Sequence, residues 1–169
     1  TGDSAGESSE ATVERWLEDL ATAVAETRER AGTRNIALVG LRLGALIAAV
    51  HGTHSGDLDS LVLWDPVYRG TDYLQELRRL HDEEVRFAYV TQNGDRRPDD
   101  TEEFLGFPMP PPLRDGIREL DLLGLERGPA RRVLVVESEV SAAGREFHDR
   151  MTGRSVDVEL QPLPDRKVW

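Results

Sequence analysis

The feature that most constrains the fold is the stretch "NIALVGLRLGALIAAV" at residues 35–50, where an apolar run passes through two close glycines into a second apolar run. Residues 36–40 are apolar at consecutive positions, which is typical of a strand covered on both faces in a parallel sheet. Residues 42–50 are apolar nearly all round, which predicts a buried helix. The chain therefore turns sharply from strand to helix, with Arg42 at the apex.

The rest of the chain predicts alternating helices and strands. Apolar residues at three- and four-residue spacing indicate an amphipathic helix over residues 9–31, with Ser9 as N-cap and Gly32 as its stop. Further strands are expected at residues 61–65, 132–138 and, as an alternating edge strand, 155–160, with a helix at 142–151. This alternation predicts an α/β fold, with a mostly parallel sheet and helices on both faces.

Residues 67–128 interrupt this alternation. A helix is predicted at 71–81, "VRFAYV" fits either a strand or a helix, and "QNGDRRPDD" is rich in turn residues. The prolines at 108, 110, 111 and 112 exclude a central strand or a helix interior. We therefore expect one α/β domain over residues 1–169, with a lid-like insertion at 67–128 above the strand ends, where such proteins place segments that face a substrate.

Composition narrows the classes of partner. The net charge of -11, from 21 basic and 32 acidic residues, repels phosphate backbones and anionic lipid surfaces, so neither nucleic acid nor a membrane is expected as a partner. No apolar run approaches the roughly 20 residues that cross a bilayer, and the first residues do not resemble a signal peptide, so a cytoplasmic location is the default. Cysteine is absent, which excludes disulfides and thiolate metal sites, and no cofactor is predicted.

The turn at Arg42 has the spacing of a nucleophile elbow, in which glycines flank an apex residue between a strand and a helix. "TGDSAG", "VGLRLGA" and "LVLWDPVYRGTDYLQELRRL" occur in that order, and the most distinctive stretch is "LW-x-PV" at residues 63–67. With these motifs the chain resembles the α/β-hydrolase superfamily, most closely exosortase-associated, serine aminopeptidase-like proteins. The resemblance implies a partial α/β-hydrolase fold related to enzymes that cleave ester, thioester or amide bonds.

The resemblance also implies that part of the domain is missing. The family places several strands and an oxyanion-hole loop before the point where this sequence begins. Independently, residues 36–40 would form an edge strand, yet they carry neither a charge nor a proline to protect that edge. We therefore expect a truncated domain; the alternative is that a partner or a second copy pairs along residues 36–40.

The family's catalytic residues are only partly represented. Arg42 stands where the resemblance places the nucleophilic serine, and its permanently protonated guanidinium cannot act as nucleophile or base. Glu139, in preference to Glu137, matches the acid position, with a solvated carboxylate as the alternative. No histidine follows Leu160. The sequence favours a catalytically silent protein that binds an anion or a protein; the alternative is a hydrolase with its chemistry elsewhere or beyond this chain.

Arg42 also suggests a binding site for an anionic small molecule, because a helix N-terminus beside a fixed cation suits a carboxylate or phosphate. Gly40, Leu43 and Asp65 are the expected neighbours of such a ligand. The helix dipole disfavours a cation at this end, so Arg42 needs an acidic partner. The candidates are Glu139, Glu137 and Asp65. A structural salt bridge is favoured over a ligand-binding role.

The histidines offer weaker candidates. His51 and His54, close to Asp57 and Asp59, allow a metal site, but the turn-like "HGTHSGDLDS" favours a polar loop at a helix end. No metal is predicted. His81 is expected at the end of a helix, where it would interact with the dipole, and His148 is expected on the surface of the helix at 142–151.

Overall fold

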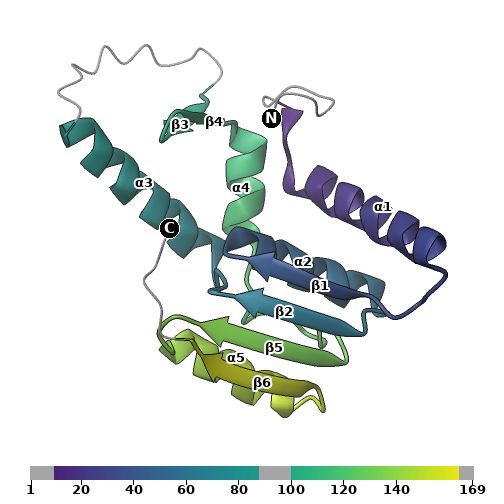
Figure 1. Cartoon of the computed structure of the whole chain (residues 1–169). Helices are drawn as coiled ribbons and strands as arrows, with labels where there is room; N and C mark the ends of the chain where they lie inside the picture. Colours follow the sequence, from purple (N-terminus) through teal and green to yellow (C-terminus); the bar gives the residue numbers. More distant parts are fainter. Residues whose placement is uncertain (1–9, 88–99, 164–169) are drawn as a thin grey trace.

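The computed structural model describes residues 10–87 and 100–163 and is built on a four-stranded sheet in the order β1-β2-β5-β6 (Figure 1). All neighbouring strands in this sheet are parallel. Its strands are β1 (Ala37–Leu41), β2 (Ser60–Trp64), β5 (Arg132–Glu137) and β6 (Asp157–Pro162). The predicted α/β fold with a mostly parallel sheet is therefore confirmed.

Helix α1 (Val13–Ala31) precedes the sheet. Its N-cap is Thr12, whose Oγ1 accepts a hydrogen bond from the Arg15 N–H at 3.2 Å. The expected cap Ser9 lies outside the described residues, and the helix begins later than predicted. Gly32 stops the helix in the left-handed conformation (φ 61°), as predicted.

Helix α2 (Leu43–Ser55) follows β1 directly and extends past the predicted end at residue 50. It is followed by Gly56 in the left-handed conformation. The histidines at 51 and 54 therefore lie within the helix rather than in a loop. Gly52 between them packs against the backbone of Pro129, where a Cβ would lie 2.0 Å from the carbonyl oxygen. Helix α5 (Ala142–Thr152) matches its prediction, and β6 begins two residues late because Ser155 takes a left-handed turn (φ 63°).

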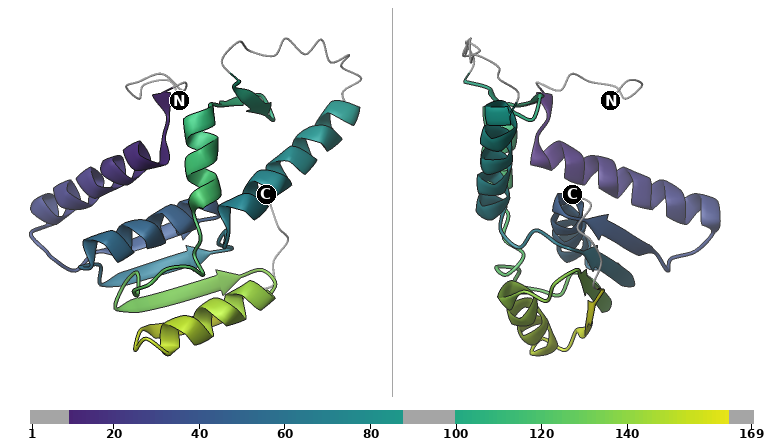
Figure 2. Two further views of the ribbon diagram at one scale, coloured as in Figure 1. Left: turned by 180° about the vertical axis from the view of Figure 1, so that it is seen from behind. Right: turned by 60° about the vertical axis from the view of Figure 1, so that its left-hand side comes forward.

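One face of the sheet, called here the covered face, holds the core. Registered residues of parallel strands point the same way, so Leu38, Leu61 and Val133 share this face, as do Leu63 and Val135 in the next row. These side chains form one apolar cluster with residues of α1, α2 and α5. From behind, α2 and α5 lie in front of the strands (Figure 2, left).

The opposite face, called here the open face, carries Val39, Leu41 and Trp64 from β1 and β2, with exposed fractions of 71%, 45% and 36%. Val62 of β2 and Leu134 of β5, which continue the row of Val39 across the sheet, are half-buried. The sequence predicted helices on both faces. Among the elements that the structure describes, α1, α2 and α5 all join the core of the covered face.

The predicted insertion at residues 67–128 contains α3 (Gly70–Phe87), the hairpin strands β3 (Glu102–Phe104) and β4 (Phe107–Met109), and α4 (Pro111–Glu119). The helix runs well past the predicted residue 81, and includes the first half of "VRFAYV"; the remainder lies outside the described residues. Prolines stand at the first turn of α4, where a missing N–H costs nothing. A second apolar cluster joins these helices to α1 and α2 through Val13, Ile47, Leu74, Leu113 and Ile117.

Candidate functional site

The elbow lies at the carboxyl end of β1, where Arg42 is the N-cap of α2 with φ 52° and ψ -121°. A non-glycine residue at such angles carries strain of roughly 1–3 kcal/mol, which surrounding contacts must hold in place. The Arg42 N–H donates to the Trp64 carbonyl at 3.0 Å, and the Val67 N–H donates to the Arg42 carbonyl at 3.3 Å. These bonds pin the apex to the end of β2.

The two glycines of the elbow are not equivalent. A Cβ on Gly40 would lie 2.4 Å from the Cα of Ala45, so only glycine lets α2 lie this close to β1. A Cβ on Gly44 would meet nothing within 4 Å. Of the two glycines, only Gly40 is required for the close approach of β1 and α2.

The Arg42 side chain forms an ion pair with Glu76 of α3, through its Nη2 and the Glu76 Oε2. The two side chains are 30% and 42% exposed. The salt bridge expected from the dipole argument is present, but its acid is Glu76 rather than Glu139, Glu137 or Asp65. The pair links the apex of the elbow to the first helix of the predicted insertion. Glu76 lies 34 positions after Arg42, so the sequence did not identify it as the partner.

Asp65, expected beside a ligand, is nearly buried at 9% exposure and has a left-handed backbone (φ 39°). Its two carboxylate oxygens accept hydrogen bonds from the Ser138 N–H at 2.7 Å and the Ser138 Oγ at 2.6 Å. The Asp65 N–H in turn donates to the Val136 carbonyl at 2.8 Å. Asp65 thus joins the ends of β2 and β5, with both of its oxygens in use.

Glu137 and Glu139, the two candidate acids after β5, have different surroundings. Glu137 is 3% exposed and accepts hydrogen bonds from the Tyr68 hydroxyl at 3.0 Å, the Ser141 N–H at 3.0 Å and the Ser141 Oγ at 2.8 Å. Burial, and then the charge of Glu137, raises the pKa of Tyr68. Glu139 is exposed and forms no hydrogen bond or ion pair with any described residue.

The preferred acid candidate is therefore the one that faces solvent, while its neighbour is built into the protein. Ser141 is the N-cap of α5 and accepts a hydrogen bond from the Gly144 N–H at 2.8 Å. A Cβ on Gly144 would lie 2.3 Å from the Glu137 carboxylate. Glu137 thus sits beneath the N-terminus of α5, where a negative charge is favourable. The participation of Tyr68 and Ser141 was not anticipated from the sequence.

The histidines do not complete a triad within the described residues, because none shares a hydrogen bond or ion pair with Arg42, Asp65 or Glu137. His51 is buried in α2 at 8% exposure, and this burial lowers its pKa. His81 lies inside α3, not at its end, and its Nδ1 accepts a hydrogen bond from the Leu105 N–H at 3.1 Å. His148 lies on α5 beside Asp149, as a surface residue would.

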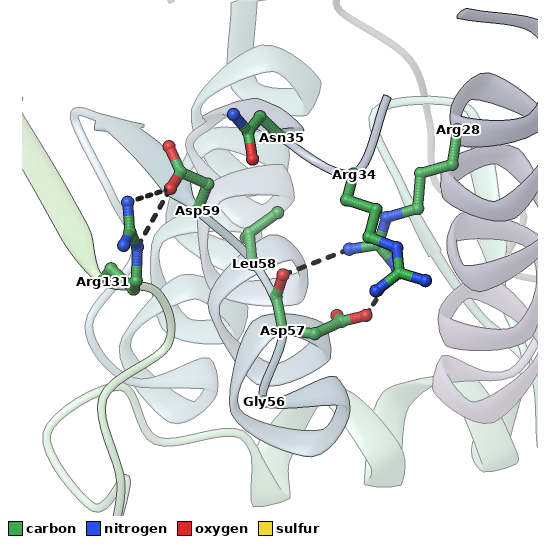
Figure 3. Close-up of a pocket in the computed structure, with 8 residues that line it drawn as sticks. All are labelled: Arg28, Arg34, Asn35, Gly56, Asp57, Leu58, Asp59 and Arg131. Atoms are coloured by element: carbon green, nitrogen blue, oxygen red, sulfur yellow. Dashed lines mark hydrogen bonds and ion pairs between the residues drawn. The ribbon is translucent and has the colours of Figure 1, made fainter. Parts of the chain in front are cut away.

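At the opposite end of the sheet a pocket of about 480 Å³ is lined by charged residues from α1, the α2–β2 turn and the start of β5 (Figure 3). Arg28 Nη1 lies 2.6 Å from Asp57 Oδ2, and Arg131 Nε lies 3.0 Å from Asp59 Oδ1. Arg132 also reaches Asp59, at 2.8 Å. The aspartates that the sequence allowed as metal ligands are thus paired with arginines. In the described part of the chain, no three His, Asp or Glu residues are grouped to hold a metal.

Comparison with known proteins supports the fold. No family profile and no curated protein matches the chain. Among solved structures it is similar to Rv0554 from Mycobacterium tuberculosis (TM-score 0.54, 18% identity, covering 92% of this chain and 65% of that one). It is also similar to a metagenome-derived lipolytic enzyme (0.57, 14%, covering 96% and 67%) and a hydrolase from Pseudomonas aeruginosa (0.55, 16%, covering 96% and 68%).

The chain spans about two thirds of the length of these structures. No helix in the described residues is long and apolar enough to cross a membrane. The parallel sheet, the strained turn between β1 and α2 and the similarity to these structures lead to one conclusion. The chain has part of the α/β-hydrolase fold.

Proposed function

We propose that this protein is a hydrolase-fold relative of serine acyl hydrolases that does not hydrolyse acyl substrates at its elbow. The observation that carries the proposal is the Arg42–Glu76 ion pair at the apex. An arginine cannot serve as a nucleophile, and this one is held by an acid from α3. The elbow then acts as a structural link between the sheet and the helices of residues 67–128.

The finer relation, to exosortase-associated and serine aminopeptidase-like proteins, belongs to this proposal and is supported by the motifs at residues 39–45 and 61–80. The similar solved structures include lipolytic enzymes and carboxylesterases at 12–14% identity. Their names as lipolytic enzymes and carboxylesterases support a common ancestry of this chain with acyl hydrolases. It does not supply a nucleophile to this chain.

Reaction with a fluorophosphonate probe, together with turnover of a short-chain p-nitrophenyl ester, tests the proposal. Both the natural protein and Arg42→Ser are expected to be inert, because no described histidine bonds near the elbow to activate a hydroxyl. Arg42→Ala is the matched control. Labelling of Arg42→Ser alone would mean that the remaining site is intact. Ester turnover by the natural protein that is lost in Arg42→Ala would contradict the proposal, whereas turnover that survives Arg42→Ala would locate the chemistry at another residue.

A second candidate function is the binding of a small anion at the elbow. Helix α2 has no side-chain cap, so its first N–H groups are open to an acceptor beside the Arg42 guanidinium. Glu76 occupies that guanidinium and would compete with a ligand carboxylate or phosphate. Binding would therefore require the ion pair with α3 to open.

Glu76→Gln tests this candidate, because it removes the competing charge while keeping the shape of the side chain. Titration with acetate and with inorganic phosphate, followed by amide chemical shifts of Leu43 and Gly44, should show about fivefold tighter binding in this variant, corresponding to roughly 1 kcal/mol for a partly exposed ion pair. Arg42→Gln is expected to abolish the response. Equal affinity in all three proteins would refute an anion site at the elbow.

A further inference from the structure

The pocket of Figure 3 lies at the amino ends of the strands, at the end of the sheet opposite Arg42. It is formed by α1, the segment before β1, the turn between α2 and β2 and the residue before β5. The lining residues nearest β1 are Arg34 and Asn35, which precede the strand, and β2 and β5 are interior strands of the sheet. The pocket is thus distinct from the elbow and from the outer edge of β1.

The two acids of this pocket are held by arginines. Arg28 Nη1 lies 2.6 Å from Asp57 Oδ2, and Arg28 Nη2 donates to the Asp57 carbonyl at 3.2 Å. Asp59 accepts hydrogen bonds from Arg131 Nε at 3.0 Å and from Arg132 Nη2 at 2.8 Å. These hydrogen bonds lower the pKa values of both carboxyl groups. Both aspartates therefore stay ionised and paired near neutral pH, and their acceptor oxygens are largely in use.

The hydrogen-bond donors of the pocket outnumber its acceptors. Arg34 is exposed, and neither its guanidinium nor the Asn35 side-chain amide has a hydrogen-bond or ion-pair partner among the described residues. Arg131 is 76% exposed and uses only Nε and Nη2 to bind Asp59. Three arginines and two aspartates line the pocket, although the whole chain carries a net charge of -11. The pocket is therefore a locally cationic site that offers donors to a ligand.

The size and lining of the pocket narrow the class of ligand. Its volume of about 480 Å³ falls within the range of small-molecule sites. Among the described residues that line it, Leu58 is the only large apolar one, and it is 3% exposed. Arg34 and Arg131 lie on opposite sides of the pocket (Figure 3). Because a guanidinium binds carboxylate or phosphate through paired hydrogen bonds, two separated arginines favour a polar ligand with two acidic groups.

We propose that this pocket binds a small hydrophilic organic polyanion, with one acidic group against Arg34 and the Asn35 amide and a second against Arg131. The chemistry required is two oxygen-rich acidic groups on a polar skeleton, as in a polycarboxylate or a sugar bisphosphate. The negative charge of the whole chain repels anions at long range, so binding depends on these short-range contacts. The site is separate from the elbow and goes beyond the function proposed above.

Titration with citrate and with fructose 1,6-bisphosphate, at constant pH and ionic strength, tests the proposal through the amide chemical shifts of Asn35, Gly56 and Leu58. Arg34→Gln removes an unpaired guanidinium and is expected to weaken binding about tenfold. Arg30→Gln is the matched control, because it removes the same charge from a residue of α1 that is 81% exposed and paired within its own helix. The control should leave the affinity unchanged.

Asp57→Asn gives the opposite prediction. It removes a competing acid and releases Arg28 for the ligand, so binding should become about fivefold tighter. Circular dichroism of each variant would verify that the fold is kept. The probe that binds more tightly decides whether the acidic groups of the ligand are carboxylates or phosphates.

Two results would overturn the proposal. One is the absence of saturable shifts at the pocket amides with either probe. The other is an equal loss of affinity in Arg34→Gln and Arg30→Gln, which would reflect charge alone. The elbow is tested separately, since Arg42→Gln should leave binding at this pocket unchanged while abolishing any response at Leu43 and Gly44. Failure of one site therefore does not imply failure of the other.

Discussion

The two faces of the sheet are formed by the same strands, but one face is buried and the other is largely exposed. On the covered face Leu61, Leu63 and Val135 are at most 1% exposed, whereas on the open face Val39 and Leu41 remain 71% and 45% exposed. Both faces of β1 are apolar in sequence. Apolar residues on a strand therefore indicate that a face needs a cover, but they do not say where the cover comes from.

Topology explains why the helices gather on one face. The strands follow the chain in one direction across the sheet, β1-β2-β5-β6. Parallel crossovers are almost always right-handed, so crossovers that all step in the same direction place their helices on the same side. A second helical layer requires a reversal of strand order. The described strands contain none, and α2 and α5, which follow β1 and β5, both pack on the covered face.

The largest loss of stability is expected at Leu63, which is 0% exposed in the core of the covered face. Leu63→Ala should destabilise the protein by about 2–5 kcal/mol, because it removes a buried side chain and leaves a cavity. Urea denaturation monitored by circular dichroism measures the change. A loss below about 1 kcal/mol would mean that the covered face is loosely packed, and the contrast between the faces would disappear.

The next largest loss of stability is expected at Gly40, with Gly44 of the same elbow as its control. Gly40→Ala drives a methyl group into the backbone of α2 at Ala45 and should cost about 1–3 kcal/mol or more. Gly44→Ala meets open space within a helix and should be neutral or stabilising by up to about 1 kcal/mol. Thermal melts of the two variants provide the measurement. Equal destabilisation would show that the elbow needs both glycines.

An intermediate effect is expected from the Tyr68 hydroxyl, which is packed on the covered side near Phe147. Burial and the charge of Glu137 raise the pKa of Tyr68, so the folded chain keeps this phenol neutral when the unfolded chain ionises it near its ordinary pKa of about 10. Stability is complete below that pH and is lost as pH rises further.

Tyr68→Phe should therefore flatten the fall in stability above about pH 10, where one such group contributes at most about 1.4 kcal/mol per pH unit. Chemical denaturation at a series of alkaline pH values follows this slope. The variant will also be less stable near neutral pH, because Glu137 loses a hydrogen-bond donor. An unchanged alkaline slope would show that Tyr68 is not the group responsible.

The smallest effect is expected on the open face. Leu41→Ala at 45% exposure should change the stability of the dilute, monomeric chain by less than about 0.5 kcal/mol. Denaturation at low protein concentration measures this value. A loss approaching that of Leu63→Ala would show that the open face is covered in solution, and the comparison between the faces would need to be revised.

The elements of the fold could largely be predicted from the sequence because local patterns decide them. The period of α1, the glycine after it and the apolar run before Arg42 each report on neighbouring residues alone. Element ends were less predictable. Helices α2 and α3 both run past their expected ends, since tertiary packing stabilises turns that local propensity leaves undecided.

The candidate site was only half predictable. The strand-to-helix turn and the need for an acidic partner to Arg42 followed from the sequence, but the identity of that partner did not. Glu76 follows Arg42 by 34 positions on another helix, and it is one of several acids that could have met it. The preferred acid Glu139 proved exposed, and the neighbouring Glu137 is bound by Tyr68, 69 positions away.

By itself the sequence determined that a strand turns sharply into a helix at Arg42, because two apolar runs meet there between two glycines. It also determined that the apex bears a cation in place of a nucleophile. Only the tertiary structure decided that Arg42 meets Glu76, that Glu137 is buried and that one sheet face is open. Those outcomes depend on how segments distant in the sequence pack together. Local sequence does not indicate which acidic residue will contact Arg42 or which will be buried.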